Sequence, residues 1–148
     1  MTIVCFHNPN EENGYLSNWY PSKFTVNDVD FSSMEQYMMY KKAVCFGDKD
    51  MADKILATDD VAEIKAFGRL VANYNESYWN GVRQIVVFEG LTAKFSQNED
   101  LKAKLKATEN FFAFFHFLSS CQHIFYYIIS FHSIKVNDNT FILYFYSI

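Results

Sequence analysis

The chain has 148 residues, of which 50% are hydrophobic and 19% aromatic, and its formal net charge is -4. A chain of this length typically forms one domain and has enough apolar residues to bury a core. The negative charge argues against a protein that binds the DNA backbone through a basic face, so we expect no dedicated nucleic-acid-binding face.

Three cysteines, Cys5, Cys45 and Cys121, lie far apart and form no C-x-x-C motif. This spacing indicates an intracellular protein with free thiols and gives no zinc site. The N-terminal residues "MTIVCFHNPNEENG" lack the basic and apolar segments of a signal peptide. We therefore expect a cytoplasmic protein that uses no metal and no cofactor.

The first third of the chain predicts strands followed by a helix. "TIVCFH" predicts a strand, "NPNEENG" a loop, and "KFTVNDVDF" two short strands with a turn at "ND". The spacing Ser32-x-x-Glu35 is that of a capping box, which predicts a helix from there to about Phe46. Gly47 then provides a C-terminal stop.

Four further helices are predicted. "KDMADKILA" is short, and the Asp60-x-x-Glu63 spacing opens a helix through "VAEIKAFGRLV". Asn75 caps a long helix, and Asn98 caps the amphipathic segment "EDLKAKLKA". The apolar side of the long helix is predicted to carry Ile85, Val86, Phe88 and Leu91.

The composition changes near residue 110. Only two charged residues, Lys135 and Asp138, lie beyond it, whereas all five glycines and both prolines precede it. The uncharged segment from Phe111 to Phe131 is long enough to cross a bilayer, but polar residues at its centre make a membrane anchor unfavourable. Two other interpretations remain: strands with a hairpin turn at "NDNT", or, as we favour, residues that do not belong to the evolved domain.

Glu35 has two interpretations. As the acid of the capping box, its carboxylate would accept a backbone hydrogen bond. Alternatively, Glu35 and Lys42 lie two turns apart on one helical face, with Met38 and Met39 on or beside it. A carboxylate and an ammonium group that bracket apolar side chains suit a pocket for a flat ring bearing an anion, or a half-buried salt bridge.

Three other segments carry candidate ligand-binding residues. Trp79 and Arg83 in "YWNGVR" share a helical face, where they either bind a ring and a phosphate or form a core tryptophan and a solvated arginine. Arg69 in "FGRL" either binds a ligand or compensates a helix C-terminus. Asn18 in "GYLSNWYP" either fixes a ligand or belongs to an ordinary turn.

The order of the motifs is more informative than any single one. "GYLSNWYP", "FSSMEQYMMYKKAVCFGD", "FGRLV", "YWNGVR" and "GLTAKFSQNEDLKAKLKAT" follow one another as in the NADAR family, the YbiA-like N-glycosidases associated with NAD and ADP-ribose metabolism, which this chain closely resembles. The resemblance runs from about Phe6 to Thr108. It implies an α+β, mostly helical YbiA-like fold with a small antiparallel sheet, and a C-terminal tail that is irregular or non-native.

The resemblance also implies a hydrolase that cleaves N-glycosidic bonds of phosphorylated ribosides. The implied partners are small molecules: ADP-ribosylated nucleobases or ribosylamine intermediates of riboflavin synthesis. Glu35 matches the catalytic glutamate of the family, and Trp79 matches its active-site tryptophan. The implied ligand-binding residues are Asn18, Lys42, Arg69 and Arg83.

The chain departs from the family after "LKAT". The family continues with an acidic residue and a Trp-Gly pair, whereas here "LKATEN" is followed by "FFAFFHF", with no glycine after Gly90 and no tryptophan after Trp79. We therefore expect residues 1–108 to be a C-terminally truncated NADAR domain, residues 109–148 to be an unrelated tail, and turnover to be low. The alternatives are a nucleotide-binding module without catalysis and a non-functional product of a frameshift or retained intron.

Overall fold

The structure is a computed structural model that describes residues 3–6, 8–107, 112–116, 126–131 and 143–147, with side chains for residues 8–107. The chain divides into two compact units. One unit is Asn18–Asn98, and the other combines Met1–Ser17 with Glu99–Ile148. All the candidate site residues lie in the Asn18–Asn98 unit, which is therefore described first.

The Asn18–Asn98 unit begins with a hairpin of β2 (Pro21–Val26) and β3 (Val29–Ser33). Asn27 and Asp28 form its turn with φ angles of 50° and 62°. Positive φ at both central residues is typical of the tight turns that join two antiparallel strands, and Asn and Asp tolerate it better than most residues. The prediction of two strands with a turn at "ND" is therefore confirmed.

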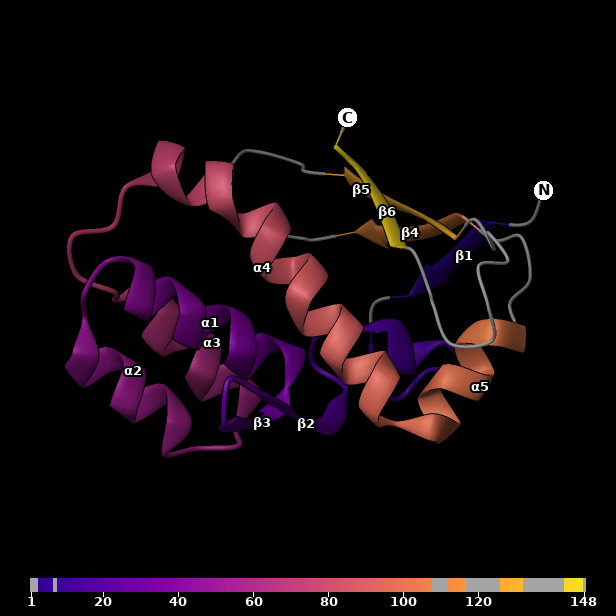
Figure 1. Ribbon diagram of the computed structural model, residues 1–148, viewed down its shortest axis with the longest axis horizontal. Coiled ribbons are helices and arrows are strands. Elements are labelled where there is room, and N and C mark those ends of the chain that lie inside the picture. The colour runs from indigo at the N-terminus through magenta and orange to yellow at the C-terminus, as the bar shows by residue number, and fades with distance from the viewer. Residues whose placement is uncertain (1–2, 7, 108–111, 117–125, 132–142, 148) are drawn as a thin grey trace. The chain divides into compact units, whose positions relative to one another are not determined.

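Four helices follow the hairpin (Figure 1): α1 (Met34–Cys45), α2 (Lys49–Leu56), α3 (Val61–Arg69) and α4 (Glu76–Gln97). Three of the predicted boundary residues are confirmed. Gly47 follows α1 with a φ of 71°, Asp60 accepts hydrogen bonds from the first turn of α3, and Asn75 accepts one from the Tyr78 N–H of α4. Local capping chemistry thus sets these boundaries.

The predicted capping box at the start of α1 is wrong by one residue. The N-cap is Ser33, whose Oγ accepts from the Gln36 N–H at 3.2 Å. In return, the Gln36 Oε1 accepts from the Ser32 N–H at 2.7 Å. The amide of Gln36 therefore fills the place that was predicted for Glu35, and the Glu35 carboxylate is not used in capping.

Helix α4 packs along α1 in the opposite direction, because Glu89 bonds to Tyr37 near the start of α1 whereas Tyr78 contacts Phe46 after its end. Gly90 permits the close approach, since a Cβ there would overlap the Tyr37 ring. Val86 and Leu91 are buried as predicted. Ile85 and Phe88 are exposed, at 70% and 40%, so their predicted place on the apolar side of the helix is wrong.

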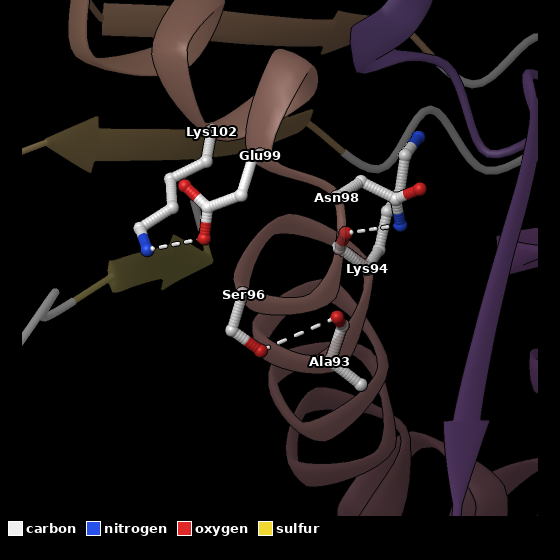
Figure 2. Close-up of polar contacts among 6 residues, drawn as sticks. All are labelled: Ala93, Lys94, Ser96, Asn98, Glu99 and Lys102. Carbon is white, nitrogen blue, oxygen red and sulfur yellow. Dashed lines mark hydrogen bonds and ion pairs between the residues drawn. The ribbon is translucent and has the colours of Figure 1, made fainter.

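The C-terminal turn of α4 is bonded to strand β2. The Gln97 side chain accepts from the Thr25 N–H and donates to the Thr25 carbonyl, both at 2.8 Å, as a neighbouring strand would. The Asn98 amide nitrogen donates to the Lys23 carbonyl and to that of Lys94, the second bond being drawn in Figure 2. Asn98 is thus the C-cap of α4, and the cap that it was predicted to form on the following helix stays a prediction.

The other unit contains β1 (Ile3–Phe6), the 3-10 helix η1 (Gly14–Leu16) and α5 (Glu99–Ala107). Its sheet has the order β1-β4-β5-β6, with β4 (Phe112–His116) parallel to β1 and the other neighbours antiparallel. Strands β5 (Tyr126–Phe131) and β6 (Leu143–Ser147) complete it. The described parts of the tail are strands, and β6 overlaps the second strand of the predicted hairpin, while the "NDNT" turn and the residues just before it lie outside the described residues.

No helix in the described ranges is both long enough and apolar enough to cross a membrane.

Candidate active site

Glu35 is a buried acid at the start of α1. Only 1% of its surface is exposed, and its backbone N–H donates to the Asn18 carbonyl at 2.9 Å. The Trp19 indole N–H donates to the carboxylate, whereas the Oε2 atom has no hydrogen-bond partner among the described residues. A buried carboxylate oxygen without a partner is costly to a fold, which makes Glu35 a candidate functional group rather than a structural one.

Two cations of α3 act on this carboxylate. Burial raises the pKa of the Glu35 carboxyl above its ordinary value, and the Lys65 charge, the Trp19 hydrogen bond and the Arg69 charge oppose that rise in part. Lys65 and Arg69 are four residues apart and therefore share one face of α3. The Lys65 ammonium group also lies 5.1 Å from the centre of the Trp19 ring.

Asn18 supports the start of α1 through its backbone and its side chain. Its carbonyl accepts from Glu35, and its side-chain nitrogen donates to the Met38 sulfur at 3.3 Å. The two contacts are one helical turn apart on α1, so the segment before β2 lies against the face that carries Glu35. Asn18 and Trp19 of the "GYLSNWYP" motif therefore lie beside the acid.

Lys42 lies further along α1, next to α3. Its Nζ donates to the Gly68 carbonyl at 2.6 Å, and burial lowers the pKa of its ammonium group. Gly68 allows this approach, because a Cβ at that position would overlap the Met39 side chain. Since Arg69 follows Gly68, the structure brings Lys42 and Arg69 to the same end of α3.

Arg83 and Lys42 both lie close to Tyr74. Lys42 lies 4.0 Å from the centre of the Tyr74 ring. Burial and the Glu76 charge raise the pKa of Tyr74, and the Arg83 charge opposes this rise. Both predicted cations thus act on one aromatic side chain.

Trp79 is buried in the first turns of α4, with 4% of its surface exposed. Its backbone N–H donates to the Asn75 carbonyl at 3.0 Å. The groups that act on the Glu35 carboxylate in the described residues are Trp19 and the cations of α3. The family resemblance implies that Trp79 and Glu35 share one active site, and this stays a prediction.

Sequence reasoning missed three residues of the site: Trp19, Lys65 and Tyr74. Trp19 lies in a motif that had been singled out, but nothing local indicated that its N–H would point at Glu35. Lys65 could have been found from its spacing of four to Arg69 on a predicted helix. Tyr74 lies in a loop, where no periodic pattern assigns a direction to the side chain.

Lys94 is a second buried charge that the sequence did not indicate. Its surface is 0% exposed, and burial lowers its pKa to about 7. Its Nζ lies 5.6 Å from the centre of the Tyr20 ring and 5.3 Å from that of Phe95. The "LTAKFSQ" segment did not indicate that Lys94 would be buried, because lysines on a surface helix are usually solvated.

The described residues contain no group of three or more His, Cys, Asp or Glu side chains arranged to hold a metal ion.

The fold and the motifs define a family. The NADAR domain matches residues 5–112, so the chain belongs to the NADAR domain family. A solved structure, the NMR structure of the Escherichia coli protein YbiA, superposes with a TM-score of 0.68 at 25% identity and covers 78% of this chain and 67% of that one. The expected α+β, mostly helical YbiA-like fold with a small antiparallel sheet is confirmed.

Three relatives carry informative names. The chain is 38% identical over 115 residues to "N-glycosidase R617" of Acanthamoeba polyphaga mimivirus, covering 72% of this chain and 68% of the relative. It is 33% identical over 109 residues to "Protein irg-1" of Caenorhabditis elegans, covering 63% and 51%. It is 30% identical over 105 residues to "Riboflavin biosynthesis protein VVA0006" of Vibrio vulnificus, covering 71% of this chain and only 28% of the relative.

Proposed function

We propose that the chain is an N-glycosidase that hydrolyses the bond between ribose C1′ and nitrogen in a phosphorylated riboside. The observation that carries the proposal is the buried Glu35 carboxylate, whose Oε2 has no partner among the described residues while Lys65 and Arg69 lie close enough to act on it. Membership of the NADAR family and similarity to a protein named N-glycosidase support it.

The chemistry requires a negative charge beside the sugar. As the C–N bond breaks, positive oxocarbenium charge develops on the ribose, and a carboxylate held in a buried setting stabilises that charge more than water does. Water adds to C1′ and loses a proton, and the leaving nitrogen gains one. Glu35 is suited to orienting that water and accepting its proton, because burial raises the pKa of its carboxyl and so makes the carboxylate a stronger base.

The neighbouring residues have supporting roles in the proposal. Lys42, Lys65, Arg69 and Arg83 bind the phosphate groups, since guanidinium and ammonium groups are the usual ligands of phosphate. Trp19 orients the carboxylate through its N–H. Trp79 stacks on the base or excludes water, and Asn18 holds the segment that carries Trp19. The substrate is an ADP-ribosylated nucleobase or a ribosylamine phosphate of riboflavin synthesis.

A second candidate is a nucleotide-binding module with little or no turnover. The observation that favours it is the composition beyond Glu109, where Asp138 is the only acidic residue. The segment with an acid and a Trp-Gly pair that the NADAR family is expected to place after the "LKAT" helix therefore has no match in the sequence beyond Glu109. A missing acid or base typically costs 100- to 10,000-fold in rate, so on this view the ligand binds without efficient hydrolysis.

The test measures binding and hydrolysis on the same purified chain. Calorimetry with ADP-ribose reports binding, and chromatography after incubation at high enzyme concentration reports release of free base from an ADP-ribosylated nucleoside and from a ribosylamine phosphate. Base release above the uncatalysed rate supports the N-glycosidase, and binding without release supports the second candidate. A chain that shows no ADP-ribose binding and no base release would contradict both candidate functions.

A further inference from the structure

Three aromatic side chains meet at the C-terminal end of α1 and the N-terminal end of α4. The Phe46 ring centre lies 5.4 Å from that of Tyr74 and 5.9 Å from that of Tyr78, at interplanar angles of 72° and 67°. Phe46 packs partly against the buried cluster around Ala43 and Ile55. Tyr74 and Tyr78 are 44% and 56% exposed. We call Phe46, Tyr74 and Tyr78 the aromatic cluster.

The cluster is not needed to fill the core, since two of its three rings face solvent. Exposed tyrosines that share contacts usually mark a binding surface, because their burial by a ligand recovers apolar area. Edge-to-face packing on Phe46 holds the two tyrosine rings in place before any ligand binds. The rings are therefore preorganised for stacking.

Cations surround the cluster. Lys42 lies 4.0 Å from the centre of the Tyr74 ring, and the Arg83 charge also acts on Tyr74. Glu76 is the acidic group whose charge acts on Tyr74 in the opposite sense. The combination of exposed aromatic rings and nearby cations is complementary to a ligand that has a flat ring and a phosphate.

We propose that the aromatic cluster, with Lys42 and Arg83, is a second ligand subsite that stacks the ring of a nucleotide and binds its phosphate. This inference rests on the proposed function, because it assigns the part of the substrate that lies away from the scissile bond.

The subsite is linked to the acid through α1 and the C-terminal end of α3. Lys42 is seven residues from Glu35, which places it about 10 Å further along the axis of α1. The Lys42 Nζ bonds to the Gly68 carbonyl, and the charge of the next residue, Arg69, acts on Glu35. Arg69 and Lys42 therefore lie between the Glu35 carboxylate and the Tyr74 ring.

This arrangement selects among the proposed substrates. A ligand that places its riboside at Glu35 and a second aromatic ring on Tyr74 or Tyr78 needs phosphate groups between the two. An ADP-ribosylated nucleobase has this form, with a diphosphate between the two riboses and an adenine ring at the far end. A ribosylamine phosphate has one ring only and leaves the cluster empty.

The test compares probes that differ in the ring. Calorimetry measures the Kd of AMP, ADP-ribose and ribose 5-phosphate for the whole chain and for Tyr74→Leu, Tyr78→Leu and the double variant. Stacking of one base contributes about 1–3 kcal/mol, so we expect the double variant to weaken AMP and ADP-ribose binding by at least tenfold. Ribose 5-phosphate binding should stay within twofold.

Two controls separate stacking from damage to the fold. Tyr74→Phe and Tyr78→Phe keep the ring and should retain AMP affinity, and Ile85→Ala removes an exposed apolar side chain of the same helix and should change nothing. Unchanged AMP affinity in the double variant, an equal loss for AMP and ribose 5-phosphate, or no AMP binding by the unmodified chain would each overturn the subsite. Failure of the proposed function is recognised separately, as no release of base above the uncatalysed rate.

Discussion

Replacing Gln36 by Leu should destabilise the fold more than any surface substitution of the same kind. Gln36 is buried directly after Glu35 and ties α1 to two other segments. Its Nε2 donates to the carbonyls of Ile55 and Thr58 at 3.1 and 2.8 Å, and its Oε1 accepts from the N–H and Oγ of Ser32 at 2.7 and 3.1 Å. Leu matches the size of Gln but makes none of these bonds.

The magnitude follows from the groups that lose a partner. Each buried backbone group left without one costs about 1–3 kcal/mol, and the Ile55 carbonyl is in this class. The groups on Thr58 and Ser32 are partly buried, so water restores part of their loss. Together we expect the free energy of unfolding to fall by about 2–4 kcal/mol.

Urea unfolding followed by circular dichroism measures this difference. The matched control is Gln84→Leu, at an exposed position on α4, which should change the free energy of unfolding by less than about 0.5 kcal/mol. If Gln36→Leu costs no more than this control, the cap and the bridge to α2 do not hold the start of α1, and the placement of Glu35 needs another explanation.

Three other predictions follow from the buried charges and from the tail. Because burial lowers the pKa of Lys94 from 10.5 to about 7, folding releases a proton between these values and stability rises with pH in that window by up to about 1.4 kcal/mol per unit. Urea titrations at pH 7 and 9.5 should show a smaller rise for Lys94→Met, and equal rises would contradict the burial. Because the pKa of Glu35 is raised, the stability gained from its protonation is present at low pH and lost as the pH rises through the folded-state pKa. The Glu35→Gln variant should therefore melt at a higher temperature than the unmodified chain at pH 8, and the difference should be smaller near pH 4. A lower melting temperature of the variant at pH 8 would contradict the destabilising burial of the Glu35 charge. Replacing residues 109–148 by the acidic and Trp-Gly segment expected of the NADAR family should raise base release by about 100- to 10,000-fold, and an unchanged rate would show that this segment supplies no catalytic acid.

Much of the fold follows from local signals in the sequence. The hairpin turn, the stop at Gly47 and the caps at Asp60 and Asn75 are short-range choices made by neighbouring residues, and the structure confirms each of them. Of the four residues predicted to lie on the apolar face of α4, two are buried and two are exposed. Val86 and Ile85 are adjacent in sequence but about 100° apart around the helix, and only the packing against α1 decides which of them is buried.

The site was predictable in its residues but not in its contacts. Ser32-x-x-Glu35 and Ser33-x-x-Gln36 are both acceptable capping boxes, and the sequence alone gives no reason to prefer the second. The choice between them frees the carboxylate, because Gln36 reaches carbonyls of α2 and the loop after it that are distant in sequence. The Trp19 bond, the Lys65 charge and the burial of Lys94 likewise depend on tertiary packing.

The most direct test of the account is the effect of Glu35→Gln on base release. The substitution keeps the shape of the side chain and an oxygen for the Trp19 N–H, but removes the charge that would face the oxocarbenium. With an ADP-ribosylated nucleoside at high enzyme concentration, we expect the release of base to fall by about 100-fold or more, with Glu12→Gln as the exposed control. A folded Glu35→Gln protein that releases base at the rate of the unmodified chain would contradict the account.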